Sequence, residues 1–296
     1  MESFAEHRPL LFTIAYEMLG TVVDAEDVLQ ESYLRWQAVD RQTVEHPRAY
    51  LVRLVTRQAL NQLRAVKARR EEYVGIWLPE PIRTAPDVSD DAILAESVSM
   101  AMMLVLETLN PTERAVFVLH DVFGFTHGEI AASVGRPEAT VRQIAHRARE
   151  HVRARRRRFE PDSEATREVV RRFLRAATTG AVQELMDLLA PDVVEFSDGG
   201  GKVVAARRPI IGRENVARFV VGVARTTPGA TRAEYATYNG LPAVGFVADG
   251  ELAWLLAFEI SGGLITGLYG IRNPDKLGRA TTVRPLDRGG PPRWKP

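Results

Sequence analysis

The clearest chemical signal in this chain is a run of cationic and amide side chains between residues 138 and 153. Arginine and glutamine can each form two hydrogen bonds with a base edge in the major groove. Residues 126–158 contain nine arginines and three glutamates, a local net charge of +6 (9 − 3), which favours binding to nucleic acid. A solvated basic helix in an ordinary bundle is the alternative. The candidate base- and phosphate-contacting residues on this face are Arg142, Gln143, His146, Arg147 and Arg149.

A second row of cations lies on a predicted helix that begins at Pro47, where proline suits the first helical position. At 100° per residue, apolar residues such as Leu51, Val55 and Ala59 form one stripe of this helix. The opposite stripe is a row of cations formed by Arg53, Arg57, Arg64 and Lys67, with Asn61 and Gln62 beside it. One face of this helix can therefore pack while the other presents positive charge.

Acidic residues could instead carry catalysis in the segment 163–277. All six histidines lie at or before His151, so this segment has no imidazole for acid–base chemistry. Its carboxylates include Asp192, Glu195, Asp198, Asp249 and Glu259, and burial could raise the pKa of any one of them. Five acids spread over such a length are more typical of surfaces and turns. We therefore expect no enzyme.

The elements that position these residues fall into five segments. Residues 1–72 and 93–158 are predicted to be helical, and residues 73–92 form a proline-containing linker. Residues 163–277 alternate helices with strand-like stretches separated by glycine turns, which predicts an α+β domain with a meandering antiparallel sheet. A strand is expected over 202–211. The tail 278–296, rich in Pro, Gly and Arg, is predicted to be disordered.

Local capping signals divide the second helical segment into a helix-turn-helix. Thr126 can cap a short helix, with Glu129 completing a capping box, and Gly135 can end that helix. The basic helix follows from Pro137. In the first segment, Asp24 is expected to cap a helix in the same way.

The composition of the whole chain limits the kinds of site it can contain and the compartment in which it is expected. The net charge of +1 hides the local basic segments, and the absence of cysteine excludes disulfides and thiolate metal sites. No signal peptide or membrane span is visible, so a cytoplasmic protein without a cofactor or metal is expected.

The acidic helix resembles a known motif. Asp24-Ala-Glu-Asp27-Val-Leu-Gln30-Glu31-Ser-Tyr-Leu-Arg35-Trp36 resembles the region-2 signature of RNA polymerase sigma factors. The resemblance implies that these residues bind the polymerase core and that the basic helix 47–70 reads the −10 promoter element. Many members of the family carry an aspartate in the position of Asn61 and a tryptophan in the position of Tyr50. The bases that this helix would prefer in the −10 element therefore stay open. The core-binding candidates are Asp24, Asp27, Gln30, Glu31 and Arg35.

The helix-turn-helix resembles region 4 of the same family, which reads the −35 element, most clearly at Thr140-Val141-Arg142 and His146-Arg147-Ala148-Arg149. Two such modules joined by a short linker are typical of the extracytoplasmic-function (ECF) class. This resemblance covers about half the chain and implies a protein that binds core polymerase and promoter DNA.

Three short motifs lie outside these two modules: Trp77-Leu78-Pro79-Glu80-Pro81, Asp198-Gly199-Gly200-Gly201-Lys202 and Asn273-Pro274-Asp275-Lys276-Leu277. They resemble motifs of the sigma-J type subgroup, which carries a fused SnoaL-like C-terminal domain, a cone with a curved sheet. Each motif is weak alone, but together and in this order they are specific. We expect the linker to dock on the fused domain, which would regulate in cis, with Lys202 paired to Glu80. The residues in these motifs are Trp77, Leu78, Glu80, Asp198, Gly199, Gly200, Gly201, Lys202, Asn273, Pro274 and Asp275.

Three alternatives stay open at this stage. The cone could sense a small molecule, with Trp254 and Phe246 in its wall, although strand aromatics are more often plain core. The chain could be a ligand-sensing helix-turn-helix regulator that does not join polymerase, or a SnoaL-type enzyme. The sign of regulation and the oligomeric state are not predicted.

Overall fold

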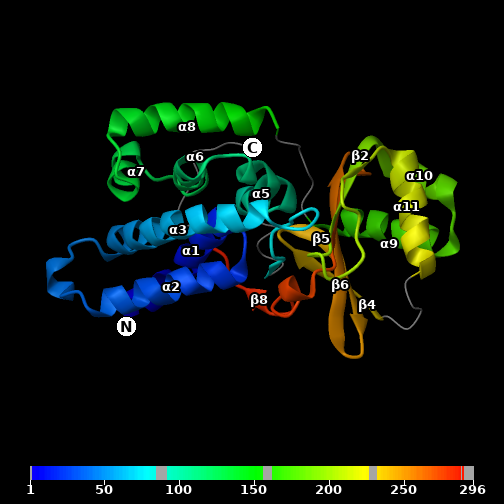
Figure 1. The fold of residues 1–296 in the computed structure, drawn as a ribbon, viewed down its shortest axis with the longest axis horizontal. Coiled ribbons are helices and arrows are strands. Elements are labelled where there is room, and N and C mark those ends of the chain that lie inside the picture. The colour runs from blue at the N-terminus through cyan, green and yellow to red at the C-terminus, as the bar shows by residue number, and fades with distance from the viewer. Residues whose placement is uncertain (1, 85–91, 156–161, 227–231, 288, 290–296) are drawn as a thin grey trace. The chain divides into compact units, whose positions relative to one another are not determined.

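The computed structural model describes residues 2–84, 92–155, 162–226, 232–287 and 289 (Figure 1). Contacts divide the chain into two compact units. The first unit, unit 1, comprises Met1–Glu72, Met102–Arg156 and Pro285–Pro296. The second, unit 2, comprises Tyr73–Ala101 and Arg157–Arg284, so the linker 73–92 belongs with the C-terminal segment.

Three helices open unit 1: α1 (Glu2–Leu19), α2 (Val22–Gln37) and α3 (Pro47–Glu71), with a short 3₁₀ turn η1 (Arg41–Thr43) before α3. Gly20 has φ of 75° and ends α1, as its lack of a side chain allows. Thr21 rather than Asp24 caps α2, because Thr21 Oγ1 accepts from Asp24 N at 3.2 Å. The cap of this helix was therefore predicted three residues too late. Trp36 of α2 is buried against Tyr50 of α3, with ring centroids 5.5 Å apart.

The second part of unit 1 contains α6 (Pro111–Phe117), a π-helical turn η3 (Val118–Val122), α7 (His127–Val134) and α8 (Glu138–Arg153). Helices α4 (Ala92–Ser97) and α5 (Met100–Glu107) precede them. The predicted capping box is confirmed: Thr126 Oγ1 accepts from Glu129 N, and Glu129 Oε2 accepts from Thr126 N. Gly135 ends α7 in the left-handed conformation with φ of 66°. The helix-turn-helix geometry thus follows from local signals.

A partly buried ionic cluster joins the two parts of unit 1. The carboxylate of Glu107 contacts both Arg70 of α3 and Arg114 of α6. Arg114 Nε also donates to Glu17 O of α1 at 2.9 Å. Burial alone would raise the pKa of Glu107, but the charges of Arg114 and Arg70 outweigh it and hold that pKa below its ordinary value of 4.5.

Unit 2 packs three helices against one face of an eight-stranded sheet (Figure 1). The helices are α9 (Glu164–Thr179), α10 (Val182–Leu188) and α11 (Arg213–Thr226). The sheet order is β3-β2-β7-β6-β5-β4-β1-β8. The strands are β1 (Arg83–Thr84), β2 (Leu189–Asp198), β3 (Ile210–Ile211), β4 (Arg232–Tyr238), β5 (Leu241–Ala248), β6 (Glu251–Ser261), β7 (Leu264–Ile271) and β8 (Val283–Arg284).

The sheet is mixed, which corrects the expected antiparallel arrangement. Strands β4 to β7 form an antiparallel meander, as predicted, with Asn239 and Asp249 at positive φ in its turns. However, β2 lies parallel to β7, from which α11 and the rest of the meander separate it along the chain, and β1 lies parallel to β8. The expected strand 202–211 shrinks to β3 at its end.

The tail is also partly ordered, contrary to prediction. Val283–Arg284 form β8, and Asp287 N donates to Thr13 Oγ1 at 3.1 Å within unit 1. Residues 288 and 290–296 lie outside the described residues. Within the described chain, no helix is both long and apolar enough to cross a membrane.

The ionic cluster predicts a pH-dependent stability. Glu107→Gln should leave Arg114 buried without its charge partner and destabilise unit 1 by about 3 kcal/mol at pH 7. Because the pKa of Glu107 is lowered in the folded state, this contribution is present above pH 4.5 and is lost as pH falls through the folded value. The gap between wild type and variant should therefore close in acid.

Hydrogen exchange of α1, α3 and α6 peptides at several pH values measures this difference. The exposed Glu150→Gln should change stability by less than about 0.5 kcal/mol. Equal effects of the two substitutions at pH 7 would contradict the assignment.

Candidate nucleic-acid interface and linker anchor

Helix α8 separates an apolar face from a polar face. Val141, Ile144, Ala145, Ala148 and Val152 are buried. On the other side, Arg142, Gln143, His146 and Arg147 are exposed and together line one shallow depression. Arg142 forms an exposed ion pair with Glu138 at 3.1 Å. Three donors and an imidazole are thus presented together to solvent.

Arg149 differs from the other predicted α8 residues. Its Nε donates to Asp121 Oδ1 at 2.7 Å, and Asp121 is 1% exposed. This ion pair attaches α8 to the π-helical turn η3. Arg149 is therefore a structural anchor of the helix as well as a cation at the edge of its polar face.

The basic stripe of α3 is mostly exposed but is not uniform. Arg53 lies over the Tyr50 ring at 5.5 Å, and Arg64 is exposed, with Nη1 3.5 Å from Asn61 Oδ1. Arg57 Nη2 donates to Ala132 O of α7 at 2.8 Å, within unit 1. The side chain of Lys67 lies outside the described residues.

Gln62 is half-buried, and its side-chain amide is bound inside the protein. Its Nε2 donates to Asp24 Oδ1 at 2.9 Å, and the other Asp24 oxygen accepts from Thr21 Oγ1 at 2.5 Å. Asp24 and Gln62 therefore link α2 to α3 inside the helical bundle. Both side chains are half-buried, whereas the predicted binding residues Asp27 and Arg64 are exposed.

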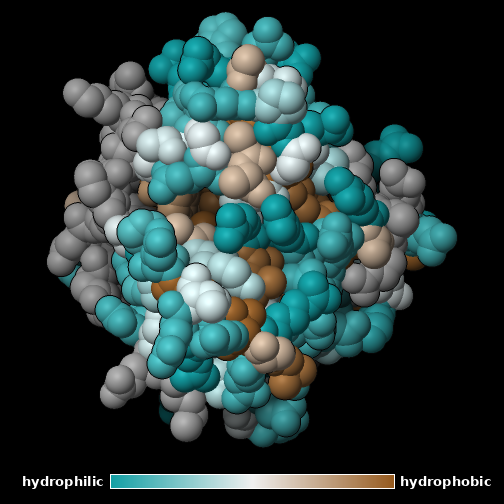
Figure 2. All heavy atoms as spheres, turned by 90° about the vertical axis from the view of Figure 1, so that its left-hand side faces the viewer, coloured by the Kyte–Doolittle hydropathy of each residue, from teal (hydrophilic) through white to brown (hydrophobic). Residues whose placement is uncertain are grey.

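The outer face of α2 carries the remaining acidic candidates. Asp27, Gln30, Glu31 and Arg35 are exposed, with Arg35 and Glu31 paired at 3.0 Å. The sequence reading missed Leu34, which is 55% exposed among them. The sequence already indicated this residue, because Leu34 is an apolar side chain on the otherwise polar stripe of this helix. Figure 2, which faces the left-hand side of Figure 1, shows mainly hydrophilic residues with small hydrophobic areas between them.

The linker is held on unit 2 by one buried carboxylate. Asp198, at the end of β2, is 0% exposed. Its Oδ1 accepts from Tyr73 Oη at 2.5 Å and Gly200 N at 3.0 Å. Its Oδ2 accepts from Leu78 N at 2.9 Å and Lys276 Nζ at 2.6 Å. Lys276 also donates to Leu78 O, so both polar backbone groups of this linker residue are bound.

The side chains around the carboxylate complete this linker anchor. Leu78 and Glu80 are buried, and Lys276 Nζ lies 4.5 Å from the Trp77 ring centroid. Burial and the adjacent Asp198 raise the pKa of Tyr73 above its ordinary value. Tyr73 and Lys276 were not predicted as site residues, although Lys276 directly follows the predicted Asn273-Pro274-Asp275.

The loop after β2 fits closely against this anchor. A side chain at Gly199 would clash with Val203 O, and one at Gly200 would clash with Asn273. Asn273 Nδ2 donates to Tyr73 Oη at 2.8 Å, and Pro274 begins the 3₁₀ turn η4 (Pro274–Lys276). Gly201 packs beside Val74 of the linker.

The expected Lys202–Glu80 pair is not the one that the structure shows. Lys202 Nζ contacts both carboxylate oxygens of Asp275, at 2.6 and 2.7 Å, on an exposed surface. Glu80 is buried with the linker and only 2% exposed. Lys202 therefore braces the loop against η4.

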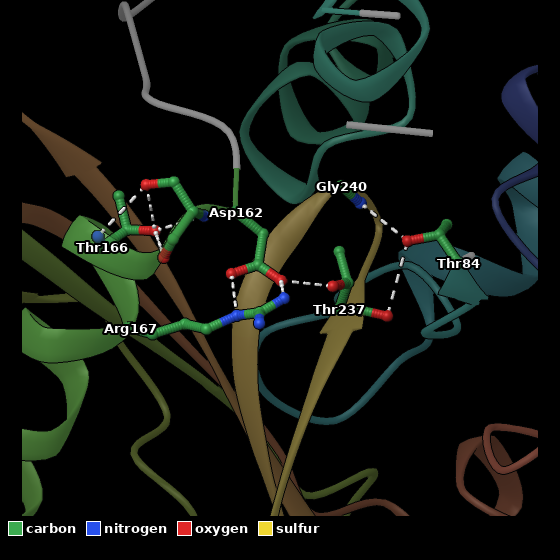
Figure 3. A network of polar contacts seen from close by, with 7 residues as sticks. Thr84, Asp162, Thr166, Arg167, Thr237 and Gly240 are labelled. Carbon is green, nitrogen blue, oxygen red and sulfur yellow. Dashed lines mark hydrogen bonds and ion pairs between the residues drawn. The ribbon is translucent and has the colours of Figure 1, made fainter. Parts of the chain in front are cut away.

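The far end of the linker is also bound to unit 2. Asn239 Oδ1 accepts from Ile82 N at 2.9 Å, and its Nδ2 donates to Val98 O at 2.8 Å. In Figure 3, Thr84 reaches Thr237 and Gly240, while Thr237 donates to Asp162. Asp162 in turn pairs with Arg167 of α9 at 2.7 Å. The linker segment Tyr73–Thr84 is thus bound at both ends to the same unit.

Comparisons with known proteins agree with this arrangement. The chain matches the family models for Sigma-70 region 2 over residues 4–70 and for Sigma-70 region 4 over residues 99–152. It is 39% identical to the ECF RNA polymerase sigma factor SigJ of Mycobacterium tuberculosis, covering 94% of this chain and 93% of the relative. It is 30% identical to the probable ECF RNA polymerase sigma factor SigI of the same species, covering 92% of each.

A solved structure resembles the whole chain. The crystal structure of M. tuberculosis SigJ aligns with a TM-score of 0.76 and 36% identity, covering 95% of this chain and 99% of the other. The resemblance therefore includes the C-terminal SnoaL-like unit as well as the two helical segments. From these matches, and from the two helical modules that carry them, we conclude that the chain belongs to the ECF RNA polymerase sigma factors.

Proposed function

We propose that the SnoaL-like unit regulates this sigma factor in cis by holding the linker between region 2 and region 4. Sigma factors bind core RNA polymerase and direct promoter-specific initiation. In this chain, we assign core binding to the outer face of α2, contact with the −10 element to α3, and contact with the −35 element to α8. The observation that carries the regulatory proposal is the buried carboxylate of Asp198, at the end of β2, which accepts hydrogen bonds from Tyr73 and Leu78 of the linker.

The length of the linker explains how such a hold would act. Promoter elements centred 25 base pairs apart lie about 85 Å apart along DNA, at about 3.4 Å per base pair. A free linker of residues 73–92 could extend about 70 Å at most, and most of that reach is lost when the segment Tyr73–Thr84 is bound. Binding of Tyr73–Thr84 to unit 2 therefore restricts the separation of regions 2 and 4.

Contacts inside unit 1 support a closed free state. Arg57 of α3 donates to Ala132 O of α7, and the Arg70–Glu107–Arg114 cluster joins the region-2 and region-4 segments. These contacts must break before the two regions can reach separate promoter elements. We therefore expect the free chain to bind promoter DNA weakly until the polymerase core separates them.

This function requires no catalytic group, and we propose that the protein is not an enzyme and acts on DNA in the cytoplasm. A ligand-sensing regulator that does not join polymerase is the competing reading. A regulator of that kind would not need a binding surface on the outer face of α2, where Asp27 and Leu34 are exposed.

Release of the linker is the first test. Lys276→Met removes the only charge that the structure pairs with buried Asp198 in the described chain, which should cost about 3–5 kcal/mol locally. Amides of residues 73–82 should then exchange at least about a hundredfold faster. Runoff transcription with core polymerase should rise several-fold, because regions 2 and 4 can separate more widely.

The matched control is Arg218→Met, which removes an exposed ion pair with Glu214 on α11 of the same unit and touches neither the linker nor its anchor. It should leave both readouts unchanged. A released linker with unchanged or lower transcription in Lys276→Met would show that the hold does not inhibit.

The outer face of α2 predicts a defect in core binding. Asp27→Lys reverses an exposed charge on this face and should weaken capture of core polymerase about tenfold. Glu6→Lys, an equal change at an exposed position of α1, is the control. Pull-down of core polymerase at two salt concentrations distinguishes the two variants. Equal capture would exclude this face as the binding surface.

The exposed face of α8 predicts a defect in promoter recognition. Arg147→Ala should reduce affinity of the polymerase complex for a −35-containing promoter by about 1–3 kcal/mol, because one cationic donor is lost. Arg218→Ala, at an exposed pair in the SnoaL-like unit, should have no effect. Promoter binding measured over a salt series tests this assignment. It is wrong if both variants bind like wild type.

A further inference from the structure

The SnoaL-like unit contains a cavity of about 510 Å³ between its helices and its sheet. Its walls come from α9 and α11 on one side and from β2, β5, β6 and β7 on the other. Small-molecule sites are typically about 300–1,000 Å³, mainly apolar, with a few placed polar groups. The cavity has both the size and the composition of such a site.

Aromatic side chains give the cavity a flat apolar wall. Phe246 of β5 and Trp254 of β6 stack with ring centroids 3.7 Å apart and planes 4° apart. Phe173 of α9 and Phe219 of α11 also line the cavity. Planar ring systems pack well in parallel or edge-on contact with such groups.

One carboxylate in this wall lacks a full set of partners. Glu195 of β2 is 3% exposed. Ser197 Oγ donates to its Oε1, but Oε2 makes no hydrogen bond to any described residue. The buried Glu259, in contrast, accepts from Tyr269 Oη at 2.6 Å and from Thr266 Oγ1 at 3.0 Å. A buried oxygen without a hydrogen bond destabilises the folded protein, so a group that could pair with Oε2 of Glu195 is expected in the cavity.

We propose that the cavity binds a neutral, largely apolar ring compound that places one hydroxyl group against Oε2 of Glu195. The apolar walls would bury the ring system, and the hydroxyl would supply the missing hydrogen bond. Ser197 would hold the carboxyl group in position through Oε1.

The charge properties of the cavity favour a hydroxyl over an ionic group. Burial raises the pKa of Glu195 to about 7, despite the hydrogen bond from Ser197 that lowers it, so both protonation states are populated near neutrality. A hydroxyl can accept from the protonated form and donate to the ionised form. A ligand carboxylate would be repelled by the ionised form, and a ligand cation would meet Arg272, which also lines the cavity.

This site is separate from the linker anchor, although both lie on β2. Val193, Glu195 and Ser197 face the helices, whereas Asp198 binds the linker. The inference therefore does not rest on the proposed regulation. Failure of either leaves the other in place.

The test uses the full chain and three matched probes: 2-naphthol, naphthalene and 2-naphthoate. Isothermal titration and quenching of tryptophan fluorescence report binding near Trp254. We expect 2-naphthol to bind at least tenfold more tightly than naphthalene, and 2-naphthoate to bind more weakly than either. No binding of 2-naphthol, or equal binding of 2-naphthol and naphthalene, would overturn the proposal.

Variants locate the site. Glu195→Leu should reduce 2-naphthol affinity to that of naphthalene and leave naphthalene unchanged, whereas Glu184→Leu, at an exposed acid of α10, should change neither. Ala224→Trp should fill the cavity from α11 and abolish binding of both probes. Circular dichroism and unchanged exchange of β6 and β7 amides confirm folding. Retention of the tenfold preference in Glu195→Leu would refute the proposed contact.

Discussion

The buried pair of Asp198 and Lys276 is the interaction on which the position of the linker depends. Taking two charges out of water is costly, and the cost is recovered only when every remaining hydrogen-bonding position is filled. Asp198 meets this condition with donors from Tyr73, Leu78 and Gly200 in addition to Lys276. These donors come from three separate stretches of the chain. The carboxylate can therefore be satisfied only when the linker, the loop after β2 and the turn η4 are assembled together.

The same strand serves two purposes because side chains alternate between its faces. Its helix-covered face carries Val193 in the core and Glu195 in the cavity wall. The end of the strand carries Asp198 and leads into the loop whose residues 204–206 also line the cavity. Arg272, which follows β7, donates to Val204 O at 2.9 Å and precedes Asn273 of the anchor. The cavity wall and the linker anchor are thus adjacent in the covalent structure.

In unit 1, a polar surface and a stable interior are obtained from the same helices. Arg142 and Arg147 are exposed on α8, whereas Arg149 is committed to Asp121. On α3, Arg64 is exposed but Gln62 is bound to Asp24 of α2. Residues of one polar stripe therefore divide between contacts inside the protein and a surface that DNA or polymerase could reach. Helical periodicity alone cannot make that division, because it gives only the direction of each side chain.

The sequence by itself determined the helices of both sigma segments, the helix-turn-helix and the meander of β4 to β7, because caps, glycine turns and periodicity act over a few residues. It also determined the family, through motifs in the two helical modules. Only the tertiary structure decided that β2 lies parallel to β7, that Lys202 pairs with Asp275, and that Lys276 is the cation of the anchor. These features depend on contacts between distant segments, whose partners cannot be read from local spacing. The unpaired oxygen of Glu195 is of the same kind, since burial is a property of the assembled fold.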